Sequence, residues 1–480
     1  MSVKSGPVHA RRLSIGAEPT RPSTLYLDAV AAATERRAAH APAIVSPHSG
    51  APDAMAQAIR SATDELDAEL RELSTAIFGF AEEGFEERRS VAAIAALLDE
   101  HGIPSRVGGW GLETSLLAGL IDGRPATVDD LLSASASASA SASGQHSPTV
   151  AILAEYDALP GVGHACGHNI IAASAAGAFL ALARAAESLP AGALPGRILL
   201  LGTPAEEGGN GKELMARAGA FEGVDAAIMV HPFGYDVADQ PFIGRRIVRV
   251  RYHGVAAHAS ATPFQGRNAL DAATLNYQAV GLLRQHLYPG DRIHGVIVNG
   301  GQRPNVVPEE AELEYYVRSE RADTLRELSD RVVDIANGIA LATGTGVEVQ
   351  WDPQPFSLPI RHNAPLAARW AERQAERGRK VLSRESVPSH LAASTDFGNV
   401  SVRVPGIHPV IAISPPDVSL HTREFAEYAA SEAGHCALAD AVYGLAAVAA
   451  DYLLDGALRD AVAADFTEAG GPLDVEGYFL

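Results

Sequence analysis

Cysteine is scarce in this sequence, whose 480 residues include only Cys166 and Cys436. Nothing in their spacing suggests the disulfide framework of small secreted domains. The N-terminal segment MSVKSGPVHARRLSIGAEPT also lacks the continuous apolar stretch of a secretory signal. We therefore expect a soluble, cytoplasmic protein with reduced thiols.

Long apolar runs and excess positive charge are missing as well. No stretch approaches the ~20 apolar residues of a transmembrane helix. The 38 Lys and Arg residues are outnumbered by 58 Asp and Glu, which gives a formal net charge of -20. This balance opposes general affinity for nucleic acid or anionic lipid, so we expect neither as a partner.

The length favours two or more domains. Residues 1–52 show little periodicity, which predicts a largely disordered tail with a short helix near YLDAVAAATERRAAH. From Asp53 two helical patterns follow, and the second ends at HGI. Residues 121–148 contain a Ser-Ala repeat that has almost nothing to bury, so we expect a floppy surface insertion there.

Strand and helix patterns then alternate, which predicts an α/β catalytic domain with a mostly parallel sheet over residues 53–243 and 357–480. TSLLAGLI and TVAILAEYD are expected to be neighbouring buried strands. Residues 244–356 differ, because β-rich strands alternate with two amphipathic helices. This segment predicts an inserted α+β sandwich, with one antiparallel sheet covered by two helices.

Polar motifs follow three of the apolar strands, namely EYD, PAEEG and MVHP. Ligands of such sheets bind beyond the carboxyl ends of the strands, so we expect these motifs to converge on one site. GHACGHN, between the first two motifs, places His164, Cys166 and His168 at alternate positions. Three interpretations stay open at this point: a metal site, a cysteine nucleophile with a histidine base, or a plain turn.

Further polar residues favour the metal site. Glu206 and Glu207 are adjacent carboxylates at a strand end, where one can coordinate metal and the other act as general base. Together with His231 and His421 they complete a set of ligand types that suits zinc or a similar divalent metal. Five such residues are enough for two metals that share a water: Cys166, His168, Glu207, His231 and His421.

Seven segments carry a resemblance to a known family. They are AEYDALPGVGHACGHN, GTPAEEGGNGK, VHPFG, GVAAHASATPFQGRNALDA, PNVVPEEAELEYYVRS, STDFGNVSVRVPGIHPVIAI and LHTREF. In this order they resemble the amidohydrolase branch of the co-catalytic metallopeptidases, which include aminoacylase and the glutamate carboxypeptidases. The likeness is greatest to aminobenzoyl-glutamate hydrolases and Xaa-Arg dipeptidase-like proteins, and it runs from about Asp53 to Leu454.

The resemblance implies a catalytic domain with two divalent metal ions, interrupted by a lid and dimerisation domain. It makes the five residues above the metal ligands, with zinc expected and manganese or nickel as alternatives. Glu206 becomes the general base that activates a water, and Asp157 supports a metal ligand. Glu155 replaces a histidine found in many relatives, which fits the branch in which Cys166 is a ligand.

The same resemblance assigns residues around the substrate. His258 would stabilise the developing oxyanion, often from the partner subunit. Asn305 and Arg318 would hold a substrate carboxylate. Thr395 and Asp396 lie in a segment that the likeness places at the pocket, in substrate recognition or around the metals.

We therefore expect a metal-dependent hydrolase that cleaves an amide or peptide bond of a small N-acyl amino acid, an aminobenzoyl-glutamate-like conjugate or a dipeptide. A homodimer is expected, supported by the helix after NALDA and an edge strand near RIVRVRYHG. Two alternatives stay open: a catalytically poor relative that acts as a ligand-binding or scaffold protein, and a cysteine hydrolase that thiol alkylation would inactivate.

Overall fold

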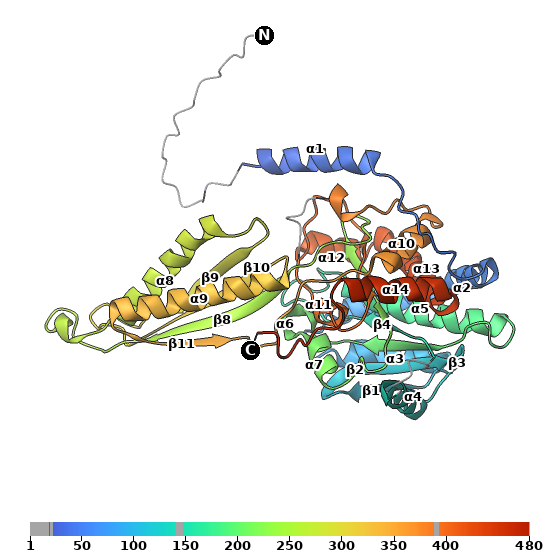
Figure 1. Cartoon of the computed structure of the whole chain (residues 1–480), viewed down its shortest axis with the longest axis horizontal. Helices are drawn as coiled ribbons and strands as arrows, with labels where there is room; N and C mark the ends of the chain where they lie inside the picture. Colours follow the sequence, from blue (N-terminus) through green and yellow to red (C-terminus); the bar gives the residue numbers. More distant parts are fainter. Residues whose placement is uncertain (1–18, 20–22, 141–146, 388–392, 480) are drawn as a thin grey trace, which may run out of the picture.

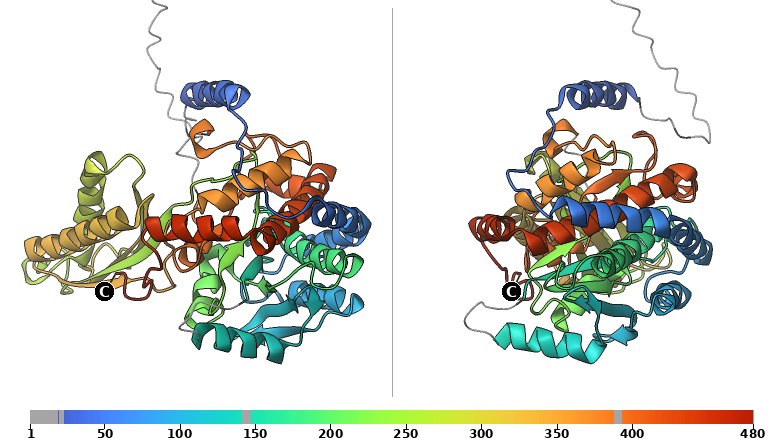
Figure 2. Two further views of the ribbon diagram at one scale, coloured as in Figure 1. Left: turned by 45° about the vertical axis from the view of Figure 1, so that its right-hand side comes forward. Right: turned by 90° about the vertical axis from the view of Figure 1, so that its right-hand side faces the viewer.

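The computed structural model describes residues 19, 23–140, 147–387 and 393–479. A large α/β domain is built from the first and last parts of the chain, and a smaller α+β domain from the middle projects to one side (Figure 1). The view turned by 45° shows the same separation, with the small domain reaching away from the helices of the large one (left view of Figure 2). The expected fold class is confirmed.

The sheet of the large domain is mixed and mostly parallel. The strand order is β1-β2-β5-β4-β6-β12, with β3 on β2. β5, β4, β6 and β12 run parallel to one another, whereas β2 is antiparallel to β1, β3 and β5. The strands are β1 Ser105–Gly109, β2 Leu112–Ile121, β3 Arg124–Pro125, β4 Thr149–Ala154, β5 Arg197–Gly202, β6 Ala226–Ile228 and β12 Gly406–Ile407. The expectation that TSLLAGLI and TVAILAEYD pair directly is wrong, because β5 lies between them.

Helices cover both faces of this sheet, so its strands are apolar on both sides. In β4, Val150 and Ile152 pack into one core cluster and Ala151 and Leu153 into another, as alternation along a strand requires. The first cluster includes α2 Asp53–Phe80, α3 Arg88–Glu100, α5 His168–Ser188, α10 Ala364–Ala375 and α13 Glu432–Leu454. The second includes α4 Val128–Ala140, α7 Gly211–Arg217 and α11 Phe397–Ser401.

The central helix α5 fits because its residues are small. A Cβ on Gly177 would come within 2.4 Å of Leu70 in α2 and 2.7 Å of Val442 in α13, so this glycine permits the close packing of three helices. α5 and α13 are both long and apolar enough to cross a membrane, but 89% and 83% of their apolar windows are buried inside the protein. The expectation that no stretch approaches that length is corrected, and both are core helices here.

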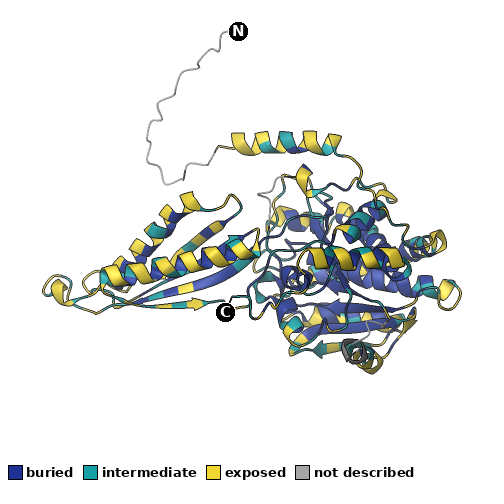
Figure 3. Cartoon of the chain, viewed as in Figure 1, coloured by how far each residue is buried: buried dark blue, intermediate teal, exposed yellow. Residues whose placement is uncertain are grey.

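The small domain is one antiparallel sheet covered by two helices, as expected. Its strand order is β11-β8-β10-β9, and α8 and α9 pack on it around a separate core. The elements are β8 Gly244–His253, α8 Ala269–Leu283, β9 Arg292–Asn299, β10 Glu310–Ser319, α9 Ala322–Thr343 and β11 Gly346–Trp351. The expectation of an edge strand near RIVRVRYHG is wrong: β8 is internal, and β9 and β11 are the edges. Much of this domain's helical surface is exposed (Figure 3).

The N-terminal segment departs from the expected disorder. The short helix is present as α1 Leu25–His40, and residues beyond it bond to the large domain: Ser46 N donates to Glu372 at 2.8 Å and Ala51 N to Asp451 at 2.7 Å. Residues 1–18 and 20–22 lie outside the described part of the chain, so the expectation made for them stays a prediction.

The Ser-Ala segment also differs from expectation. Residues 128–140 form α4, whose Leu131 is buried in the second core cluster, so this part is not a floppy insertion. Residues 141–146 of the repeat are outside the described residues.

Two helices, rather than one continuous helix, span Arg423 to Leu454. α12 Arg423–Ala429 ends before Ser431, whose side chain accepts a hydrogen bond from Gly434 N and starts α13. The other elements are α6 Glu206–Gly209, β7 His231–Phe233, β13 Val410–Ala412, α14 Gly456–Glu468 and three 3₁₀ turns, Pro263–Gln265, Arg284–His286 and Arg384–Ser386.

Candidate active site

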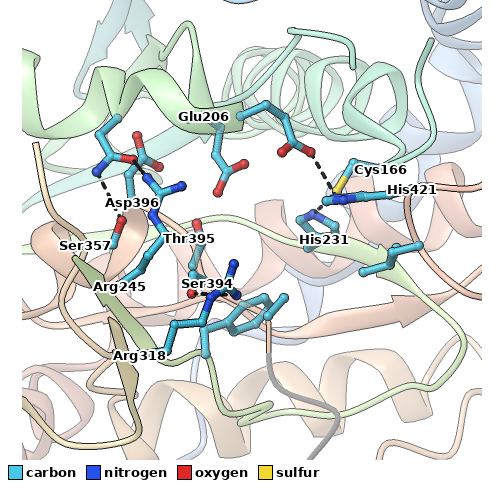
Figure 4. Close-up of a pocket in the computed structure, with 16 residues that line it drawn as sticks. Cys166, Glu206, His231, Arg245, Arg318, Ser357, Ser394, Thr395, Asp396 and His421 are labelled. Atoms are coloured by element: carbon cyan, nitrogen blue, oxygen red, sulfur yellow. Dashed lines mark hydrogen bonds and ion pairs between the residues drawn. The ribbon is translucent and has the colours of Figure 1, made fainter. Parts of the chain in front are cut away.

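A cavity of about 120 Å³ lies where the two domains meet (Figure 4). The large domain contributes loops that follow its strands, and the small domain contributes Arg245 from β8 and Arg318 from β10. Of the residues predicted from sequence, the lining includes Cys166, Glu206, Glu207, His231, Arg318, Thr395, Asp396 and His421. The PAEEG and MVHP motifs therefore converge on the cavity, whereas Glu155 and Asp157 of EYD lie beside it, near Glu206 and His168.

The five predicted metal ligands form two groups that share one residue. Cys166, His168 and His231 make one group, and Cys166, Glu207 and His421 make the other. Within each group the potential ligand atoms lie within 4.8 Å of one another. Thiolate, imidazole and carboxylate donors in two triads that meet at one sulfur fit two divalent transition metals.

The hydrogen bonds of two histidines leave one nitrogen of each ring for a metal. His168 Nδ1 lies 3.1 Å from Asp157 Oδ1, and His231 Nδ1 lies 2.7 Å from the Pro232 carbonyl oxygen. When each Nδ1 carries the proton, Nε2 presents its lone pair to the cavity, as in metal sites whose ligands are held by an outer partner. His168 Nε2 is buried without a hydrogen bond, which marks a place for a ligand.

Local backbone geometry brings these groups together. Gly167 adopts a left-handed conformation with φ of 81°, and a Cβ there would lie 2.8 Å from Pro232, so only glycine lets the Cys166 segment approach His231 this closely. Ala205 and His421 are also left-handed, with φ of 57° and 63°. Such strain in residues with a Cβ is typical of functional sites.

Asp157 organises two residues at once. Its Oδ1 faces His168, and its Oδ2 accepts a hydrogen bond of 2.9 Å from Glu207 N. Burial would raise the pKa of Asp157, but His168 and the Glu207 N–H outweigh it and lower that pKa. Asp157 is therefore an ionised anchor for the His168 ring and the Glu207 backbone.

The two glutamates diverge as the sequence suggested. Glu207 has ψ of 77° inside the short α6, and its Oε1 lies 3.2 Å from His421 Nε2. Glu206 is only 9% exposed and belongs to a carboxylate cluster with Glu155 and Asp396. Burial and the neighbouring carboxylates raise the pKa of Glu206 well above its usual value, as is common for catalytic acids and bases.

The other ligand types respond to burial as well. Burial, with the nearby His168, lowers the pKa of His231 to about 4, which keeps this ring neutral and able to bind metal. Burial and the Glu207 carboxylate raise the pKa of the Cys166 thiol well above its ordinary value. A bound divalent metal reverses this effect and holds a cysteine as thiolate.

Lys212 is a site residue that the sequence reasoning missed. It is fully buried, and its Nζ lies 2.5 Å from Glu155 Oε1 and 2.7 Å from Asp396 Oδ1. Burial alone would lower the pKa of Lys212, but the carboxylates of Asp396 and Glu155 outweigh this effect and raise the pKa. Asp396 therefore reaches the cavity with its charge already paired. The sequence did offer one signal for Lys212: the chain has only three lysines, and this one directly follows EEGGNG.

Four predicted residues lie outside the cavity lining, namely Asp157 and His168, described above, and His258 and Asn305. His258 and Asn305 are exposed in loops of the small domain, where Ala259 N donates a 3.0 Å hydrogen bond to the Asn305 carbonyl. His258 Nδ1 accepts bonds from Ser260 N and Ala261 N. The described chain brings these two residues together, but not to the cavity.

The remaining substrate candidates do face the cavity. Thr395 is buried in the lining, and Arg318 Nη1 donates to Ser394 Oγ at 3.4 Å. Arg245 lies directly across the strand pair from Arg318 and was missed by the sequence reasoning. The RRIVRVRYHG segment contains four arginines, and the sequence does not distinguish the one that reaches the site.

Comparison with known proteins identifies relatives with this architecture. Residues 151–444 match peptidase family M20/M25/M40. The chain is 37% identical to the Xaa-Arg dipeptidase of Mus musculus over 403 residues, which cover 84% of this chain and 90% of that protein. It is 32% identical to a p-aminobenzoyl-glutamate hydrolase subunit of Escherichia coli (strain K12), with 66% of this chain and 79% of that protein covered.

Solved structures show the same fold. A dinuclear metal-binding peptidase of the M20 family from Bacillus subtilis superposes with a TM-score of 0.61 at 20% identity, covering 81% of this chain and 99% of that one. An aminobenzoyl-glutamate utilization protein from Klebsiella pneumoniae gives 0.60 at 22% identity, covering 82% and 98%. Since the family match spans more than half of the sequence, this chain belongs to peptidase family M20/M25/M40 and is a metal-dependent hydrolase of amide or peptide bonds.

Proposed function

We propose that this enzyme hydrolyses small N-acyl amino acids, aminobenzoyl-glutamate-like conjugates or dipeptides, with Glu206 as its general base. The observation that carries the proposal is the position of Glu206. Its carboxylate shares the cavity with both ligand triads and lies within 4.8 Å of potential ligand atoms of His168 and Glu207. The names of the mouse and Escherichia coli relatives support this substrate range.

The two triads would hold the metals, one through Cys166, His168 and His231 and the other through Cys166, Glu207 and His421. Metals bound there supply Lewis acidity, which polarises an amide carbonyl and lowers the pKa of a water molecule. Thiolate and imidazole donors support zinc, with manganese and nickel as the alternatives.

The protein's own groups would move the proton and hold the substrate. Glu206 accepts a proton from the attacking water and returns it to the leaving nitrogen, a role that its position beside the ligand groups supports. Asp157 keeps the His168 ring oriented. Arg318, whose guanidinium faces the cavity, would pair with a substrate carboxylate.

A homodimer is part of the proposal. The edge strand β9 exposes Val296 and Val298 by 60% and 58%, and α8 exposes Leu282 by 67%. Exposed apolar edge strands are normally covered, and a second copy related by two-fold symmetry would cover this one. Light scattering should give twice the chain mass, and V296K/V298K should give the monomer. A monomeric parent protein would contradict the proposal.

The dimer would also explain the position of His258, which lies outside the cavity of its own chain. We propose that it acts on the cavity of the second copy. Mixing inactive H258A with inactive E206Q would then create hybrid dimers with one complete site. Random pairing should restore roughly a quarter of wild-type activity. No recovery on mixing would contradict action between subunits.

The proposed activity is tested by a panel of aminobenzoyl-glutamate, N-acetyl amino acids and dipeptides. Release of the free amino acid should be measured before chelation, after chelation and after metal is restored. We expect hydrolysis that disappears with the metal and returns with it. Two bound metals without hydrolysis of any panel member would instead support a ligand-binding protein.

A further inference from the structure

Two arginines stand side by side on one wall of the cavity. Arg245 of β8 and Arg318 of β10 are direct partners in the antiparallel register, so their side chains leave the same face of the sheet. Both line the cavity on a different side from Cys166, His231 and His421 (Figure 4). This pair is independent of the metal-ligand groups.

Neither guanidinium has an ionic partner among the described residues. No carboxylate of the described residues lies within 4.0 Å of either guanidinium, the limit for an ion pair. The Nε atom of each arginine is buried without a hydrogen bond. Their hydrogen bonds go to neutral groups, from Arg245 to Asn210 Oδ1 at 3.2 Å and from Arg318 to Ser394 Oγ at 3.4 Å. Both also stack near Tyr316, at 5.4 and 5.7 Å from the ring centre.

Two unpaired cations in direct cross-strand contact are unfavourable. Burial and the charge of Arg245 together lower the pKa of Arg318, which reflects this cost. Buried charges are normally paired, so the arrangement has room for two negative charges from a ligand.

The acidic residues of the cavity do not pair with these two arginines. Lys212 engages both oxygens of Asp396, through Nζ and through its backbone N–H. Glu207 faces His421, and Glu206 is the proposed base. One substrate carboxylate would satisfy Arg318, which leaves Arg245 available for a second.

We infer that Arg245 is a specificity-determining residue that selects substrates whose released amino acid has an acidic side chain. This inference rests on the proposed amide hydrolysis at the same cavity. A glutamate-type or aspartate-type side chain pairs with the planar fork of Arg245 while the α-carboxylate pairs with Arg318. An arginine side chain would instead meet two like charges. This enzyme is therefore expected to disfavour the residue for which its mouse relative is named.

The test uses the metal-loaded full chain and the matched dipeptides Ala-Glu, Ala-Gln and Ala-Arg. Glutamate and glutamine side chains are nearly equal in size, so their kcat/KM ratio isolates the charge. We expect Ala-Glu to exceed Ala-Gln by roughly 10- to 100-fold, as for hydrogen bonds to charged groups, and Ala-Arg to be the poorest. R245Q should bring the Ala-Glu to Ala-Gln ratio close to one, and R245K should retain part of it.

The matched control is R249Q. Arg249 is exposed on the same strand and pairs with Glu314 at 2.8 Å, so this variant should keep the wild-type ratio. Circular dichroism and thermal melting should verify that each variant folds. A ratio near one in the wild type, a preference for Ala-Arg, or an unchanged ratio in R245Q would overturn the inference and leave the proposed function intact.

Failure of hydrolysis itself is a distinguishable outcome. If no panel substrate is cleaved, the proposed function fails, and calorimetry with free glutamate and glutamine then tests Arg245 directly. Tighter binding of glutamate that is lost in R245Q would support acidic selection by this wall. Equal binding of the two amino acids would overturn it.

Discussion

The two walls of the cavity are built in opposite ways. On the metal-ligand wall, buried side chains are held by fixed partners, such as Asp157 for His168 and the Pro232 carbonyl for His231. On the arginine wall, Arg245 and Arg318 are cations without an ionic partner among the described residues. The first wall is preorganised for chemistry, whereas the second is completed by the charge of a ligand. Within one chain, the proposed metal ligands and the base thus belong to the large domain and the two arginines to the small domain.

The largest effect should come from the base itself. Glu206→Gln keeps the size of the side chain but removes its proton acceptor, so we expect kcat to fall about a hundredfold to ten-thousandfold. Metal content, measured by elemental analysis, should stay at the wild-type level because this substitution changes no proposed ligand. Near-normal turnover with bound metal would remove Glu206 from the mechanism.

A stability measurement distinguishes paired from unpaired charge. Lys212→Met leaves Glu155 and Asp396 buried without their cation, so the free energy of unfolding should fall by about 3–5 kcal/mol. Lys380→Met is the matched control, because Lys380 is exposed and its Nζ donates only to backbone carbonyls. Urea unfolding measures both variants. Equal stability of the two would contradict a structural role for the Lys212 network.

The shared thiolate is tested by Cys166→Ala. Cys166 belongs to both ligand groups, so its loss should weaken metal binding by at least about 10- to 100-fold. Cys436→Ala removes the other, exposed cysteine and should leave metal affinity unchanged. Competition with a chelator measures both affinities. A fully loaded and active Cys166→Ala variant would show that this thiol is not a ligand.

A substitution in the arginine wall should lower the affinity for substrate. Arg318→Gln removes a charge-assisted contact with the substrate carboxylate, so kcat/KM should fall roughly 10- to 100-fold, mainly through KM. Metal content and the free energy of unfolding should change little, because Arg318 forms no ion pair within the described chain. A loss confined to kcat would instead place Arg318 in the chemical step.

The smallest expected effect is on the stability of the folded protein at acid pH, and it concerns His164 near the metal-ligand wall. Burial, with the nearby His168, lowers the pKa of His164 from 6.5 to about 4, so the folded protein keeps this ring neutral. Below pH 6.5 the unfolded chain takes up a proton that the folded chain does not, and stability falls until about pH 4. His164→Gln should remove about 1.4 kcal/mol per pH unit of this slope. Urea unfolding at several pH values between 4 and 6.5 measures the slope.

Exposed His286 provides the control for that slope. His286→Gln should follow the wild-type dependence on pH. An unchanged slope in His164→Gln would contradict a neutral buried ring at that position.

The residues of the metal-ligand wall were largely predictable, because the sequence patterns that indicate them are local. Glu206, Glu207 and His231 each follow an apolar strand, and the carboxyl ends of such strands meet at one edge. Lys212 was missed because a lysine in a helical pattern is usually exposed. Its burial depends on Glu155 and Asp396, which are far from it in sequence.

In the arginine wall, Arg318 was predicted through the family resemblance, but Arg245 could not be identified from sequence for a related reason. Arg249 and Arg251 are paired with Glu314 and Glu312 across the sheet, whereas Arg245 is not, and only the register with β10 decides this. The same cross-strand pairs explain the error about β8. Arginines can lie in this internal strand because their charges are paired with glutamates of the neighbouring strand.

The most direct test of the account is metal content by elemental analysis, combined with hydrolysis of the amide panel before and after chelation. We expect two divalent metals per chain and release of the free amino acid that stops on chelation and returns with the metal. A protein without metal whose hydrolysis resists chelation and is abolished by thiol alkylation would contradict it, and Cys166 would then be a nucleophile.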